Sequence, residues 1–281
     1  MIPLDDIKKW FEKLNDESTF YVFSQQEKDE FLRLPLLERR SLLKDLFEKP
    51  ADQYIITPWY FWNKWVEALL AVNRQTSHIR LLELASGANT GVPKAMAVAF
   101  QHPETSYVTA NSNKELTKWF LEGTKDLPIQ IKVIEDDAKQ IEDYTSNEFF
   151  DVVAFEHAVN DIIYNMLAQR AGFDTVHINW FDILPDMIKL TNKEFLNGTL
   201  EASVKNELIG IFSACMKVLK KGSYIIINHF MYSYDLDKGI NYDFWENLLP
   251  IIRRWVNSAG LGREVFIEGF EPQWWMFIEK E

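Results

Sequence analysis

The 281-residue sequence is poor in the features that mark secreted and membrane proteins. It has one cysteine, Cys215, which excludes an intrachain disulfide and fits a reducing compartment. No uninterrupted apolar run is long enough to cross a bilayer. Residues 1–17 mix acids with bases and lack the apolar stretch of a signal peptide. We therefore expect a cytoplasmic protein that does not bind membranes.

Basic residues are also scarce. The chain has 30 Lys and Arg against 42 Asp and Glu, a formal net charge of -12. Binding to polyphosphates depends on clustered bases, so we expect no nucleic-acid partner and instead a small substrate, neutral or cationic. With 47% hydrophobic and 26% charged residues, the chain can bury a sizeable core and is typical of a globular protein. The sequence makes no prediction of oligomeric state.

Apolar periodicity divides the chain into two parts. Residues 1–75 carry apolar residues at helical spacing, ending in the aromatic segment 59–72, and predict a helical N-terminal cap. Residues 76–281 alternate strand-length apolar runs with helical ones, which predicts a largely parallel sheet with helices on both faces. The expected strands lie within residues 79–85, 106–111, 129–135, 150–156, 223–230, 264–270 and 274–280.

Two segments complete the predicted plan. The last two strands are separated by three residues, too few for a helical crossover, so they should pair antiparallel. Residues 162–205 are too long for a simple connection and predict a helical insertion. We expect a doubly wound, seven-stranded, mostly parallel sheet with an antiparallel last strand and a helical cap. The cap and the insertion would form a lid over the carboxyl edge, with Trp180, Phe181 and Tyr234 facing the substrate.

Polar residues follow most of the predicted strands. In open parallel sheets, ligands bind outside the carboxyl ends of the strands. After the first strand, Gly87 allows backbone to pass close to a ligand, and Asn89 tolerates positive φ. The other polar strand ends are Glu83, Asn111, Asp137, Glu156, His157, Asn160, Asp161, Asn228 and His229.

The glycine spacing separates two ligand classes. A nicotinamide or flavin site calls for G-x-G-x-x-G, whereas here Gly87-x-x-x-Gly91 follows an acid, Glu83. The ordered set ELASGAN (83–89), DDA (136–138), FFDVVAFEH (149–157) and LKKGSYIIINHF (219–230) resembles class I S-adenosylmethionine-dependent methyltransferases of the small-molecule type. The resemblance covers residue 76 to the C-terminus.

The resemblance implies S-adenosyl-L-methionine as cofactor, S-adenosyl-L-homocysteine as product and a Rossmann-like methyltransferase fold. The implied cofactor contacts are Glu83 at the amino end, Ala85, Gly87 and Asn89 at the three glycine positions, Asn111 on the ribose, Asp137 with Ala138 at the adenine, and Glu156. Three of these depart from the family pattern. Ala85 and Asn89 replace glycines, and Asn111 replaces an acid whose charge would make a stronger acceptor.

Methyl transfer to an acceptor that carries a proton needs a base. His157 and His229 end neighbouring strands, so their side chains can face one substrate, and histidine titrates near neutrality. Asp161 or Glu156 can orient an imidazole or bind a substrate ammonium, and Asn160 or Asp161 can instead cap a helix. His78 and His102 lie at the amino ends of their strands. Without cysteine clusters or helical histidine spacing, no metal site is predicted.

The sequence therefore predicts an enzyme, a methyltransferase of the EC 2.1.1 type that acts on an oxygen or nitrogen of a small molecule. Two alternatives remain. One is an enzyme that uses the same cofactor for a different group transfer. The other is a non-catalytic, methyltransferase-like scaffold, which the departures at Ala85, Asn89 and Asn111 favour and the polar strand ends, Asp137 and His157 above all, oppose.

Overall fold

A computed structural model describes residues 58–73, 76–229 and 238–281. Most of the predicted N-terminal cap, residues 1–57, lies outside the described residues, as does Tyr234. The part of the cap that is described is one helix, α4 (Pro58–Val72), which matches the predicted aromatic segment. In the described ranges, no helix is long and apolar enough to cross a membrane.

Seven strands form one sheet in the order β3-β2-β1-β4-β5-β7-β6. The strands are β1 (Arg80–Leu84), β2 (Ser106–Ala110), β3 (Gln130–Ile134), β4 (Phe150–Glu156), β5 (Leu219–Asn228), β6 (Arg263–Val265) and β7 (Trp275–Glu279). β1 to β5 run parallel, and β7 lies between β5 and β6, antiparallel to both. The predicted seven-stranded sheet with an antiparallel last strand is confirmed.

One predicted strand is much shorter than expected. β6 contains only Arg263–Val265, and the following residues to Trp274 form turns. Phe266, which the pattern placed inside a strand, is 73% exposed, so it has no apolar surface to pack against. Gly269 adopts a φ of 86°, a turn conformation that a strand does not use. The apolar run therefore predicted a longer strand than the structure has. The antiparallel pairing of this strand with β7 was predicted correctly.

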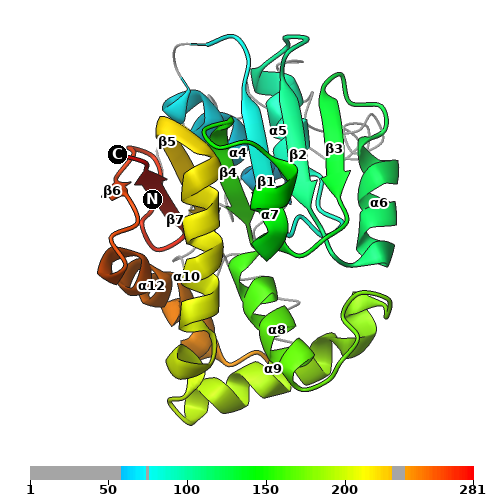
Figure 1. The fold of residues 1–281 in the computed structure, drawn as a ribbon, viewed down its shortest axis with the longest axis vertical. Coiled ribbons are helices and arrows are strands. Elements are labelled where there is room, and N and C mark those ends of the chain that lie inside the picture. The colour runs from blue at the N-terminus through cyan, green and yellow to red at the C-terminus, as the bar shows by residue number, and fades with distance from the viewer. Residues whose placement is uncertain (1–57, 74–75, 230–237) are drawn as a thin grey trace, which may run out of the picture.

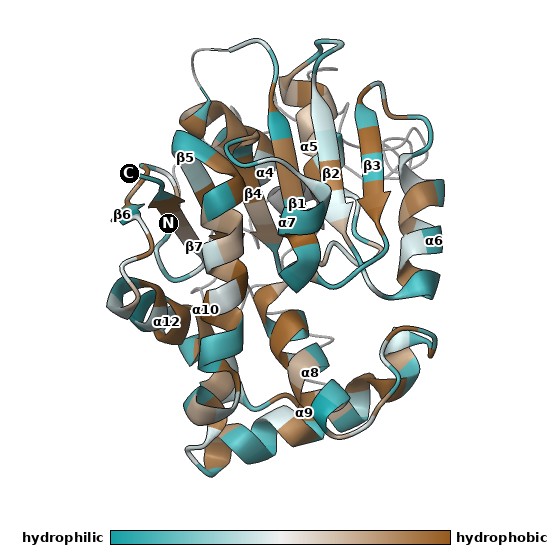
Figure 2. Cartoon of the chain, viewed as in Figure 1, coloured by the Kyte–Doolittle hydropathy of each residue, from teal (hydrophilic) through white to brown (hydrophobic). Residues whose placement is uncertain are grey.

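Helices cover both faces of the sheet, because the central strands carry apolar residues on both sides. Leu81 packs with α4, α5 (Gly91–Ala99) and α6 (Lys114–Thr124), whereas its neighbour Leu82 packs on the opposite face. The helices on that opposite face are α7 (Ile141–Tyr144), α8 (Val159–Arg170), α9 (Trp180–Leu196), α10 (Leu200–Val218) and α12 (Tyr242–Ser258), and a short 3-10 turn, η3 (Ala138–Gln140), precedes α7. Figure 2 shows hydrophobic and hydrophilic residues alternating along α9, α10 and α12, as one-sided burial requires.

The predicted insertion consists of α8, α9 and the first part of α10. α8 and α9 lie beyond the carboxyl ends of the strands, in the lower part of Figure 1. The loop between them is held to the start of α6 by three hydrogen bonds. Asn113 Nδ2 donates to the carbonyls of Thr175 (2.9 Å) and Ile178 (3.0 Å), and Lys114 N donates to the carbonyl of Val176 (3.1 Å). The insertion therefore borders the edge where polar strand ends gather.

The turn into β6 generates a stability prediction. Gly262 has a φ of 74°, and a Cβ at this position would collide with the backbone carbonyl of Glu279 on β7. We expect Gly262→Ala to lower the free energy of unfolding by about 2–3 kcal/mol, from backbone strain and the displaced strand together. Urea denaturation measures this loss.

Gly260 is the matched control in the same turn. It has a φ of 64°, but no atom lies within 4 Å of the position that its Cβ would take. Gly260→Ala should therefore show only the backbone strain, about 1 kcal/mol. Equal losses in the two variants would contradict the proposed clash with Glu279.

Candidate functional site

A cleft that is open to solvent lies at the carboxyl ends of β1, β2 and β3. Six of the predicted site residues line it: Ala85, Gly87, Asn111, Asp137, Ala138 and Asp161. Its other walls are formed by Ala110, Ser112, Asn113, Leu116, Asp136, Lys139, Ile162, Asn165, Met166, Trp180 and Ile211. The cleft is thus bordered by the sheet edge, by the starts of η3 and α6, and by the insertion.

The loop after β1 turns sharply at the base of this cleft. Ala85 and Gly87 adopt φ values of 53° and 59°, in the left-handed region. Asn89, a residue type that tolerates positive φ, does not adopt one here. Its side chain instead stabilises the start of α5, where Asn89 Oδ1 accepts a hydrogen bond from Gly91 N at 2.9 Å. At Ala85 and Gly87 the loop therefore brings its backbone to the cleft. The hydrogen bond from Gly91 N to Asn89 Oδ1 closes the end of the loop.

Asn111 joins the end of β2 to this loop. Its Nδ2 donates to the carbonyl of Gly87 at 2.8 Å, and the residue is only 4% exposed. A net hydrogen bond of this kind contributes about 1 kcal/mol to stability. With Nδ2 engaged, Oδ1 is the amide atom left to accept a bond from a ligand hydroxyl in the cleft.

Two adjacent acids end the third strand, and both line the cleft. Asp137 Oδ1 accepts from Lys139 N at 3.0 Å and so caps η3. Asp136 accepts a hydrogen bond from the Tyr144 hydroxyl at 2.6 Å, which, with the Asp137 backbone N–H, lowers the pKa of the Asp136 carboxyl. Sequence reasoning selected Asp137 alone. The DDA motif contains both acids. Their roles differ in the structure, because Asp137 caps η3 and Asp136 does not.

Four polar side chains form a buried row across the sheet at its carboxyl edge. In the order of the strands they are Thr109 (β2), Glu83 (β1), Glu156 (β4) and Asn228 (β5), each no more than 4% exposed. Thr109 pairs with Glu83 and Glu156 with Asn228 in the strand register. We call these four residues the polar row. Within the described residues, Glu83 and Glu156 do not line the cleft.

The two acids of the polar row interact. Tyr107 donates its hydroxyl hydrogen to Glu83 Oε2 at 2.5 Å, and the Asn89 side chain hydrogen-bonds Glu156. Burial raises the pKa of Glu83 well above its ordinary value, and repulsion from Glu156 raises it further. Burial likewise raises the pKa of Glu156 to about 8. The pair therefore does not carry two full negative charges at neutral pH.

His157 and His229 come together, as their positions at neighbouring strand ends predicted. Their rings stack with centroids 5.7 Å apart and planes inclined by 13°, and both contact Trp245 of α12. His229 is 2% exposed, and its Nε2 lies 3.3 Å from the carbonyl of Trp245. His157 is partly exposed and has a φ of 50°. Among the described residues, neither histidine lines the cleft.

Both imidazoles are held neutral. Burial lowers the pKa of His157 well below its ordinary value, and the neighbouring His229 lowers it further. Burial lowers the pKa of His229 to about 4, although the Trp245 carbonyl acts in the opposite direction. A neutral imidazole has a lone pair that can accept a proton. Of the two residues, His157 is the less buried, although its Nδ1 is enclosed.

Asp161 lies in the first turn of α8 and lines the cleft, and Asn160 Nδ2 donates to its Oδ1 at 2.8 Å. The interpretation of Asn160 or Asp161 as a helix cap is wrong. The N-cap of α8 is Ala158, which has no side-chain acceptor, so the first turn is stabilised by the carboxylate of Asp161 near the positive end of the helix dipole instead.

Helices α8 and α10 supply the wall that sequence reasoning largely missed. Asn165, Met166 and Ile211 line the cleft from α8 and α10. The helical periodicity of these segments predicted only which face of each helix is buried, so nothing in the pattern indicated the cleft. Trp180 of α9 also lines it, as expected for a lid residue, whereas Phe181 is 45% exposed and stacks on Trp119 of α6 with centroids 6.2 Å apart.

Comparisons with known proteins give low similarities. No protein-family model and no curated protein matches the sequence. Solved structures that match include a SAM-dependent methyltransferase from Aquifex aeolicus (9% identity, 85% of this chain and 95% of that chain, TM-score 0.43). Others are precorrin-6y C5,15-methyltransferase from Geobacter metallireducens (11%, 83% and 93%, 0.42) and a Bordetella parapertussis protein described as a possible exported protein (11%, 100% and 99%, 0.44). At these identities the likeness does not extend to function.

The buried acids predict a pH dependence of stability. The pKa of Glu156 is raised in the folded state, so folding binds a proton that the unfolded chain has lost between about pH 4.3 and 8. Stability should therefore fall as pH rises through this window, by about 1.4 kcal/mol for each pH unit. Glu156→Gln removes the titrating group, so the variant should gain stability relative to the parent at pH 8.5 but not at pH 5.

Denaturation by urea at the two pH values measures the difference. Glu268→Gln, an exposed acid in the turn before β7, is the control and should change the parent's pH dependence little. A Glu156→Gln protein with the same pH dependence as the parent would show that Glu156 is ionised in the folded state.

Proposed function

We propose that the protein is a methyltransferase that binds S-adenosylmethionine in the cleft and transfers its methyl group to an oxygen or nitrogen of a small molecule. The observation that carries the proposal is the cleft itself. It gathers Gly87, Asn111, Asp137 and their neighbours from three strand ends that the sequence resemblance assigned to one cofactor. The sheet order places this cleft where doubly wound folds bind nucleotides.

The cleft offers a distinct contact for each part of the cofactor. The loop at Ala85 and Gly87 brings backbone close to the methionine and ribose portion. Asn111 Oδ1 accepts a hydrogen bond from a ribose hydroxyl, because Nδ2 is already bonded to Gly87. Asp137 accepts from the adenine amino group beside Ala138. Met166 and Ile211 supply apolar surface for the adenine ring.

Charge favours this ligand. S-adenosylmethionine carries a positive sulfonium and a positive ammonium group, and the protein has a formal net charge of -12. Asp136, Asp137 and Asp161 line the cleft, whereas Lys139 is the one basic side chain among the described lining residues. Lys139 is paired with Glu207. A cationic ligand is therefore attracted, and transfer of the methyl group reduces that positive charge by one and favours release of the product.

In the reaction, the acceptor attacks the methyl carbon as the carbon–sulfur bond breaks, and S-adenosylhomocysteine leaves. The acceptor's proton passes to a base. We assign this role to His157, because its imidazole is neutral and the residue is less buried than His229. His229 is a weaker choice as base, because it is only 2% exposed, and its contact with His157 suits a positioning role.

Cofactor binding is tested by filling the cleft. Asn165 lies on the cleft wall and is partly exposed, so Asn165→Trp adds bulk to the cleft without disturbing the core. We expect titration calorimetry to show S-adenosylmethionine and S-adenosylhomocysteine binding to the parent, and at least about tenfold weaker binding to the variant.

Gln169→Trp is the matched control, because Gln169 is exposed one turn further along α8 and does not line the cleft. Its binding should equal that of the parent. If both variants bound the cofactor as tightly as the parent, the cofactor site would have to lie outside this cleft. Absence of binding to the folded parent would reject the methyltransferase proposal and favour the scaffold alternative.

The base assignment is tested with His157→Asn, since asparagine also accepts the positive φ of this position. With an acceptor found by screening small amines and phenols, kcat should fall about 100-fold or more while cofactor affinity stays the same. His177→Asn, a surface histidine of the insertion paired with Asp174, is the control and should have the parent's kcat. An unchanged kcat in His157→Asn would exclude His157 as the base.

A further inference from the structure

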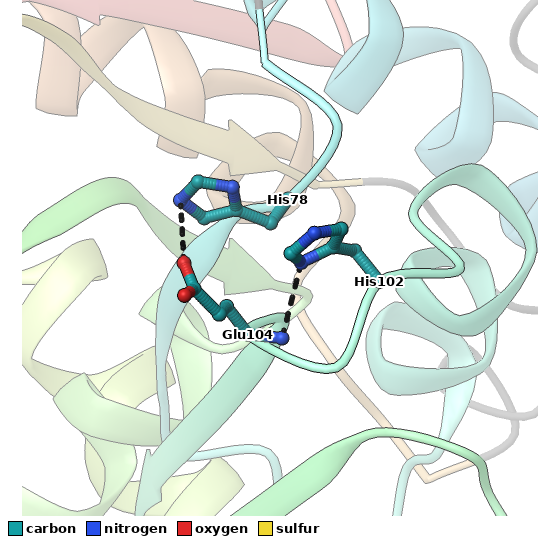
Figure 3. A group of neighbouring side chains, drawn as sticks. All are labelled: His78, His102 and Glu104. Carbon is teal, nitrogen blue, oxygen red and sulfur yellow. Dashed lines mark hydrogen bonds and ion pairs between the residues drawn. The ribbon is translucent and has the colours of Figure 1, made fainter.

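We propose that His78, His102 and Glu104 form a binding site for a late first-row divalent cation, with Zn²⁺ as the best match. The three residues lie at the amino ends of β1 and β2, opposite the cleft (Figure 3). The proposal is therefore independent of the methyltransferase reaction. Sequence spacing did not indicate it, because His78 and His102 are 24 positions apart and meet only through strand pairing.

The potential ligand atoms already converge. One ligand atom from each of the three residues lies within 4.8 Å of the other two. The imidazole centroids are 5.3 Å apart, and His78 Nε2 lies 3.7 Å from Glu104 Oε2. Ligand atoms around tetrahedral zinc are about 3.3 Å apart, given bonds of about 2.0–2.1 Å. Side-chain rotation, mainly of the 62% exposed Glu104, is enough to close the difference.

The backbone holds the ligands in place. β1 and β2 pair in parallel with Arg80 opposite Ser106, so His78 and Glu104 each lie two residues before the first paired position. Asn73 Nδ2 and Thr76 Oγ1 donate to the carbonyl of His78 at 3.1 and 2.7 Å. The position of the site is thus fixed by the strand register.

The turn that carries His102 and Glu104 is held by hydrogen bonds on both of its sides. Ser106 N donates to Ile79 O at 3.0 Å, and Thr105 N closes the turn on His102 O at 2.9 Å. From β3, Gln130 Nε2 donates to the carbonyl of Pro103 at 2.9 Å. A cation therefore requires side-chain movement but no rearrangement of the turn.

The ligand types select the cation. Two imidazole nitrogens with one carboxylate suit Zn²⁺ and its late first-row neighbours, whereas Mg²⁺ and Ca²⁺ prefer all-oxygen sites. His102 Nδ1 has a lone pair that accepts a long hydrogen bond from Glu104 N, 3.2 Å. His102 Nδ1 can give up this weak hydrogen bond and bind the metal ion instead. Three protein ligands leave the fourth tetrahedral position to water.

The test measures zinc binding directly, by competition with a chromophoric chelator, on protein without a histidine tag. We expect one Zn²⁺ per chain at micromolar concentration and a rise in Tm with added Zn²⁺, whereas Mg²⁺ should have neither effect. His78→Ala, His102→Ala and Glu104→Gln should each weaken binding about tenfold or more and abolish the rise in Tm. Because these residues lie at the surface, circular dichroism should show folded variants.

His177→Ala is the matched control, because His177 also lies beside a carboxylate, that of Asp174 at 3.1 Å, but without a second imidazole. It should bind Zn²⁺ as the parent does. Stoichiometric binding that survives all three site variants, or that His177→Ala weakens as much, would overturn the proposal. Absence of micromolar binding by the parent would overturn it as well.

Discussion

The constraint on which the rest of this structure depends is the coverage of the sheet by helices on both faces. The central strands, which are buried on two sides, carry apolar residues at nearly every position, so most of their polar side chains lie near the strand ends. At the carboxyl edge this confinement produces both the polar row and the cleft. At the opposite edge it leaves His78 and Glu104 beside each other. Both candidate sites follow from the same packing.

Local sequence patterns predicted the fold well, because most of its elements are specified by apolar periodicity and by turns. The strand runs, their alternation with helices and the antiparallel end of the sheet were all predictable from them. Strand ends such as Gly87, Asn111 and Asp137 could also be identified, since in a parallel sheet every such end meets at one edge. Strand length was less predictable. Phe266 shows that an apolar run extends a strand only where a partner surface exists.

Contacts that depend on the rotation of a helix or on the register of two strands could not be predicted. Asn165 and Ile211 line the cleft because α8 and α10 pack at a particular rotation, which periodicity does not fix. The approach of His78 to His102 depends on the register of β1 against β2. The left-handed backbone at Ala85 and His157 is likewise imposed by surrounding structure, since neither residue type demands it.

The pairing of Glu83 with Glu156 has a consequence for ligand binding. Two carboxyl groups whose pKa values are raised by burial respond strongly to a nearby positive charge, which favours their ionised forms. A cation that binds close to them therefore displaces protons into solvent. By linkage, its affinity rises with pH through the range in which the pair titrates. A cationic ligand bound beside the polar row would thereby have its occupancy coupled to the proton concentration of the surroundings.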